Sequence, residues 1–149
     1  MDLSYLRATR ANHLSLLRGL TAAQLNHIPA PHRNNLIWNA GHVIATQELL
    51  TYGLAGVKTP SGKVFIDRYR KGTVPEGEAS QEEIDLILDR LTTGVDRLEE
   101  DLSALDFSNF REYPTSYGIT LRSVEEGLRF NHLHEAMHLG TMIALRKYV

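Results

Sequence analysis

Apolar residues recur every three or four positions along most of this chain, a spacing typical of amphipathic helices. Ile84, Leu88 and Leu91 illustrate the rhythm in one of the longest such segments. Four long helices are expected over about residues 2–19, 35–54, 80–105 and 123–149. Asn34 or Asn35 is expected to cap the second of these helices.

Helix-start motifs and loop-forming residues between these segments support the same four helices. Thr21–Gln24, Ser80–Glu83 and Ser123–Glu126 each fit the capping-box pattern that marks a helix start. Residues 55–79 form a Gly-, Pro- and Lys-rich connection with a short helical piece around Val64–Lys71. Residues 106–121 are expected to form a second polar loop without strands.

Long amphipathic helices without strand signals predict an all-α fold, a four-helix bundle with long connections. The chain has 149 residues, of which 42% are hydrophobic and 23% charged. This balance supports a real core, and the length fits a single domain spanning residues 1–149.

Charge and composition exclude several classes of protein. The net charge of −2 and the pI near 6.4 leave no basic field for nucleic acid. No apolar run approaches the roughly 18 residues of a membrane span. The first residues carry charges where a signal peptide would be apolar, so a cytoplasmic location is expected. Without cysteine, any metal site must use histidine and carboxylate ligands.

Three of the seven histidines form a candidate metal site. His134 and His138 are four residues apart, so both lie on one face of the last helix. His42 lies on the mostly apolar face of the second helix and should also point into the bundle. Three imidazoles would leave coordination positions open, as in a catalytic metal site. The competing interpretation is that these are buried, hydrogen-bonded histidines. Seven histidines in 149 residues give by chance roughly 0.3 pairs at a spacing of four, so the pair alone is weak evidence for a metal.

The segment from His134 through Glu135 to His138 also fits the HExxH pattern of zinc proteases. Those enzymes need a third ligand downstream, and the eleven residues after His138 contain no His, Asp or Glu. We therefore expect Glu135 behind the ligands, at an interface or on the surface rather than as a general base.

The other histidines and two aromatic residues are expected to have ordinary structural roles. Surface or capping positions are expected for His13, His27, His32 and His132. Trp38 and Phe130 each lie one turn before a candidate ligand and are expected mainly to pack, although they could line a pocket wall.

Two longer motifs resemble a known family. The first is Asn34-Asn-Leu-Ile-Trp-Asn-Ala-Gly-His42-Val-Ile-Ala-Thr-Gln47, and the second is Phe130-Asn-His-Leu-His134-Glu-Ala-Met-His138-Leu-Gly140. Together with the tract Tyr113-Pro-Thr-Ser-Tyr-Gly118, they resemble the DinB/YfiT-like superfamily over nearly the whole chain.

The resemblance implies an up-down-down-up bundle that holds a divalent metal, often zinc or nickel, on His42, His134 and His138. It also implies a homodimer and, for some relatives, reactions that use low-molecular-weight thiols such as bacillithiol or mycothiol. A thiol-dependent S-transferase acting on small electrophiles is therefore the first hypothesis. The alternatives are a hydrolase that uses hydroxide on the metal and a non-catalytic metal-binding stress-response protein. No catalytic residue beyond the ligands is identified.

Overall fold

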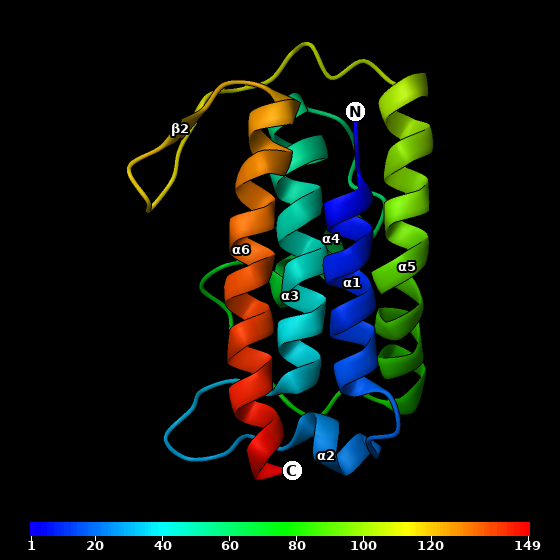
Figure 1. Ribbon diagram of the computed structural model, residues 1–149, viewed down its shortest axis with the longest axis vertical. Helices are drawn as coiled ribbons and strands as arrows, with labels where there is room; N and C mark the ends of the chain where they lie inside the picture. The colour runs from blue at the N-terminus through cyan, green and yellow to red at the C-terminus, as the bar shows by residue number, and fades with distance from the viewer.

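Four long helices pack side by side in the computed structural model, which describes residues 1–149. They are α1 (Ser4–Leu17), α3 (Leu36–Glu48), α5 (Gln81–Ala104) and α6 (Val124–Leu145). Helices α1 and α6 run in one direction and α3 and α5 in the other (Figure 1). Each of α1 and α3 packs against both α5 and α6. The expected all-α, up-down-down-up bundle is confirmed.

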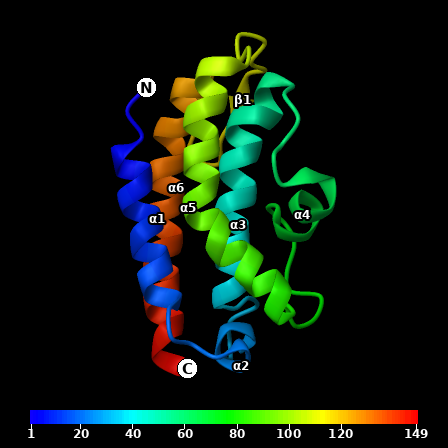
Figure 2. The ribbon, with the colours of Figure 1, turned by 90° about the vertical axis from the view of Figure 1, so that its right-hand side faces the viewer.

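Shorter elements fill the connections. Helix α2 (Ala22–Asn26) follows α1, and α4 (Gly62–Tyr69) lies beside α3, as Figure 2 shows. The second long helix differs from expectation near its end, because α3 passes into a π-helical turn, η1 (Leu49–Gly53). The last helix likewise ends in a short 3-10 turn, η2 (Arg146–Tyr148).

Side chains cap the helices at the expected places. The Thr21 hydroxyl accepts a hydrogen bond from the backbone N–H of Gln24, and the Gln24 side-chain oxygen accepts one from the backbone N–H of Thr21. These two bonds form a capping box. Ser80 and Ser123 each accept from the backbone N–H three residues later. Asn35 is the residue that caps α3. These contacts satisfy backbone donors that a helix start would otherwise leave unpaired.

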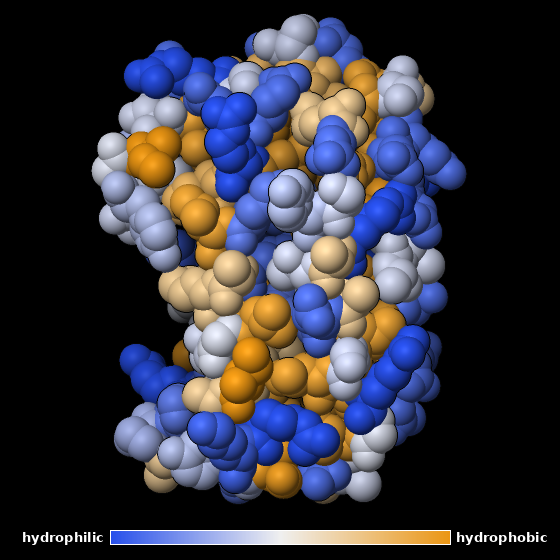
Figure 3. All heavy atoms as spheres, viewed as in Figure 1, coloured by the Kyte–Doolittle hydropathy of each residue, from blue (hydrophilic) through white to orange (hydrophobic).

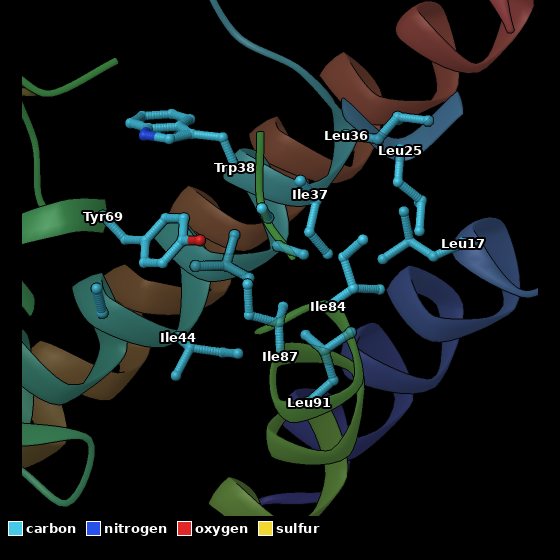
Figure 4. Close-up of a cluster of buried hydrophobic side chains, with 14 of the residues drawn as sticks. Leu17, Leu25, Leu36, Ile37, Trp38, Ile44, Tyr69, Ile84, Ile87 and Leu91 are labelled. Carbon is cyan, nitrogen blue, oxygen red and sulfur yellow. The ribbon is translucent and has the colours of Figure 1, made fainter. Parts of the chain in front are cut away.

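Helix α3 is buried on nearly all sides, because α2, α4, α5 and α6 all pack against it. Ile37 and Ile44 of α3 pack with Ile84 and Leu91 of α5 in the largest apolar cluster, as Figure 4 shows. None of the helices combines the length and the apolar composition that crossing a membrane requires.

The loop before α6 contains a small hairpin, so the expectation of a strand-free loop was wrong. Strand β1 (Tyr113–Pro114) pairs antiparallel with β2 (Thr120–Leu121). Thr115 stabilises the turn, since its hydroxyl donates to the Ile119 carbonyl oxygen at 2.8 Å. Strands of two residues are too short to show an alternating pattern in the sequence. The hairpin extends sideways from the top of α6 (Figure 1).

Candidate metal centre

Three histidine side chains meet where α3 packs against α6. His42 comes from α3, and His134 and His138 come from α6. One ring nitrogen of each lies within 4.8 Å of the other two. The Nε2 atoms of His42 and His134 are 3.2 Å apart. That separation fits two nitrogen ligands of one ion, which lie about 3.0–3.4 Å apart when each is about 2.1 Å from the metal.

Hydrogen bonds orient two of the three rings. Nδ1 of His42 donates to the carbonyl oxygen of Tyr69 at 2.6 Å, which leaves the Nε2 lone pair available. Gly41 makes room for this contact, because a Cβ there would lie 2.5 Å from the Tyr69 ring. Nδ1 of His138 donates to the Asn39 side-chain oxygen at 2.8 Å, and the Asn39 amide donates to the backbone at the start of α3. Such partners fix the tautomer that presents Nε2 to a metal.

Burial and mutual proximity keep the three imidazoles uncharged. Burial, reinforced by the neighbouring histidines, lowers the pKa of His134 to about 3 and the pKa of His138 to about 3. Burial also lowers the pKa of His42. At neutral pH each ring is therefore in the form that binds metal.

The two aromatic residues near the triad have different positions. The indole of Trp38 stacks on the His42 ring, with centroids 4.8 Å apart and planes inclined by 10°. Trp38 therefore packs against a candidate ligand, as expected. Phe130 lines a pocket wall, where the ring of Tyr117 in the hairpin packs edge-on against it with the ring centroids 5.4 Å apart.

A pocket of about 480 Å³ opens directly onto the three histidines. This volume lies within the range of about 300–1,000 Å³ that small-molecule sites occupy. Its walls come from α3, the π-helical turn η1, the hairpin and α6. Its apolar lining includes Leu49, Leu50, Leu54, Phe130 and Met137. A larger hollow of about 680 Å³ lies among Met1, Leu105 and Phe107, contains no histidine, and is not a candidate for this chemistry.

Sequence comparison identifies the family of this chain. The family model of the DinB superfamily matches residues 5–142, which is most of the chain. The chain belongs to the DinB superfamily. No curated individual protein matches its sequence. Superfamily membership and the clustered histidines are together compatible with metal binding.

In this DinB superfamily member, Glu135 does not serve as the general base of an HExxH protease. Its side chain is fully buried and does not line the pocket. Its carboxylate accepts hydrogen bonds from Arg10 at 2.7 and 2.9 Å and from Asn131 at 2.7 Å. Arg10 also donates to the carbonyl oxygen of Val43 at 3.3 Å. Arg10 thus joins α1 to the residues next to His42 and His134.

The expected surface or capping role of His13 was wrong. His13 is fully buried, and its Nδ1 lies 4.0 Å from the Glu135 carboxylate. It shares the inner face of α1 with Arg10, three residues before it, and Leu17, four residues after it. Burial lowers the pKa of His13, so the ring is neutral at physiological pH. A histidine on a helix face that also holds leucines was the signal for burial.

Removal of a bound metal should leave this fold intact. A bundle of this size buries its own core and does not need a metal to fold. At a hundredfold excess over its dissociation constant, a bound ion would add about 2.7 kcal/mol of stability. Chelation is therefore expected to lower Tm by about 5–10 °C while the helical circular dichroism spectrum persists. Loss of helix on chelation would instead make the metal structural.

Proposed function

We propose that this chain is a divalent-metal-dependent enzyme in which His42, His134 and His138 hold zinc or nickel and a low-molecular-weight thiol reacts with a small electrophile. The observation that carries the proposal is the opening of three neutral imidazoles onto one ligand-sized pocket. Three histidine ligands add no negative charge, so a bound ion keeps its full charge and would lower the pKa of a thiol beside it.

The residues of the chain have distinct parts in such a reaction. The backbone carbonyl of Tyr69 and the side chain of Asn39 orient the rings of His42 and His138. The apolar wall, including Phe130, would pack against the apolar part of the substrate. The thiol sulfur forms a bond to the electrophilic carbon, the leaving group departs with its electron pair, and the thiol proton passes to solvent.

The composition of the pocket favours a thiol over water as nucleophile. No Asp or Glu lines it, so no carboxylate is placed to act as a general base. A thiol has an ordinary pKa near 8.5, whereas water has one near 15.7, so a thiol needs much less activation. Hydrolysis is the alternative outcome of the test.

A paired assay tests this proposal. Zinc- or nickel-loaded protein is incubated with an aryl halide and a panel of small thiols, and in parallel with esters and amides without thiol. Thioether formation that depends on both metal and thiol is expected, and His138→Ala should abolish it. Turnover of esters without thiol would support the hydrolase, and inactivity in both arms would favour a metal-binding protein without catalysis.

We also propose that the chain forms a homodimer. Helix α6 exposes an apolar outer face, in which Leu133 and Ile143 are each about half exposed and Ala136 and Gly140 lie between them. Figure 3 shows apolar atoms gathered over the lower half of α6, with polar side chains around them. Small residues among large apolar ones would let a second copy approach closely.

Light scattering at micromolar concentration should give about twice the chain mass of 16.8 kDa. Ile143→Glu should then shift the protein toward monomer, whereas Leu86→Glu, which changes an exposed leucine on α5, should not. A wild-type mass of 16.8 kDa would contradict the dimer.

A further inference from the structure

Two positively charged side chains line the pocket and have no part in the chemistry above. Lys71 follows α4, and Arg111 lies just before the hairpin. Both are exposed, and neither forms an ion pair with a carboxylate. Although they are far apart in sequence, the fold brings them to one pocket.

The acidic residues nearest to these cations in sequence are engaged elsewhere. Asp67 pairs with Arg70 at 3.5 Å and also with Lys63, so it does not neutralise Lys71. Glu112 lies 3.6 Å from Arg122, so it does not neutralise Arg111. The pocket therefore contains two cations and no anion of its own.

The main chain fixes the position of Arg111 beside the pocket. Its backbone N–H donates to the carbonyl oxygen of Leu54 at 2.7 Å, and Leu54 itself lines the pocket. The hairpin also rests on α6, since Tyr117 contacts Phe130 and its hydroxyl donates to the sulfur of Met137 at 3.5 Å. The guanidinium of an arginine at this position can donate two hydrogen bonds to one carboxylate.

We infer that the substrate is a small organic anion, with a carboxylate-like group bound by Lys71 and Arg111 and an apolar body against Leu49, Leu50 and Phe130. The volume of about 480 Å³ accommodates such a molecule together with its reactive end near the histidines. The inference rests on the proposed function for the orientation of the substrate, but the charge recognition itself requires only the side chains of this chain.

Matched ligands test this inference by calorimetry. The probes are benzoate, phenylacetate, 4-phenylbutyrate and octanoate, each compared with its neutral amide of nearly equal shape. Each is titrated into metal-free and zinc-loaded protein at low ionic strength, because salt screens exposed charges. The variants are Lys71→Gln, Arg111→Gln and the double variant. Lys58→Gln and Arg129→Gln are the controls, since each removes one exposed positive charge outside the pocket.

The carboxylates should bind wild type at least tenfold more tightly than their amides, in both metal-free and zinc-loaded protein. The double variant should lose at least tenfold in carboxylate affinity and little in amide affinity, and the controls should resemble wild type. A preference for carboxylates seen only with zinc and unaffected by the double variant would place the anion on the metal, which would overturn the inference and leave the metal proposal standing. Failure of every carboxylate to bind at millimolar concentration would overturn it as well.

Discussion

Replacing Arg10 with Met, or Glu135 with Gln, is expected to destabilise the bundle strongly. Both side chains are almost completely buried, and each is the other's charge partner. Removing one leaves an uncompensated charge or donor in the interior, at a cost of about 3–5 kcal/mol. Tm should fall by about 10 °C in thermal unfolding.

A control from the same helix separates this effect from the general loss of an ion pair. Arg7 lies one turn earlier in α1 and pairs with Asp96 and Glu99 at the surface. Arg7→Met should change Tm far less, because solvent screens exposed pairs. Equal losses of Tm in Arg7→Met and Arg10→Met would contradict a special role for the buried pair.

The double variant Arg10→Met/Glu135→Met tests whether the pair also positions the metal site. Apolar replacement of both partners of a buried pair is often neutral for stability, so much of the lost Tm should return. Metal affinity should nevertheless stay about tenfold to a hundredfold weaker, because the link from α1 to the residues beside His42 and His134 is gone. Wild-type affinity in a stable double variant would show that the pair serves folding alone.

Replacing any one of the three histidines should weaken metal binding by about a hundredfold or more. Structural zinc sites with four ligands bind with about 10–16 kcal/mol, so each ligand contributes on the order of 3 kcal/mol. Competition of each His→Ala variant against a zinc-responsive dye measures the effect for His42, His134 and His138.

His132→Ala is the matched control for this series. His132 lies on the same helix as two of the candidate ligands and does not line the pocket. Its removal should leave zinc affinity unchanged. In wild type, binding should also alter the fluorescence of Trp38, the only tryptophan of the chain, which stacks on His42. Equal zinc retention in all four histidine variants would reject the assignment.

Local periodicity predicted the helices and the inward orientation of the three histidines, and the family resemblance supplied the pairing of His42 with the two histidines of the last helix. His134 and His138 share a helix face by their spacing, and His42 lies on the apolar side of its own helix. The capping residues Thr21, Ser80 and Ser123 set the helix starts by local hydrogen bonds.

Features that depend on distant partners were not predicted. Glu135 is buried because Arg10, 125 residues away, neutralises it, and no single-helix pattern reveals such a pair. The presence of Lys71 and Arg111 in one pocket likewise depends on how the long connections fold back. The π-helical turn η1 and the two-residue strands are too short for a periodic signal.

An anomalous difference map from crystals of zinc-loaded protein, recorded at the zinc absorption edge, tests the central claim most directly. Tyr69 and Asn39 set the tautomers of His42 and His138, and Nε2 of His134 lies 3.2 Å from Nε2 of His42. These contacts predict one peak per chain, about 2.1 Å from the Nε2 atoms of all three histidines. A peak elsewhere in the chain, or none in contact with all three rings, would contradict the claim that these histidines hold the metal.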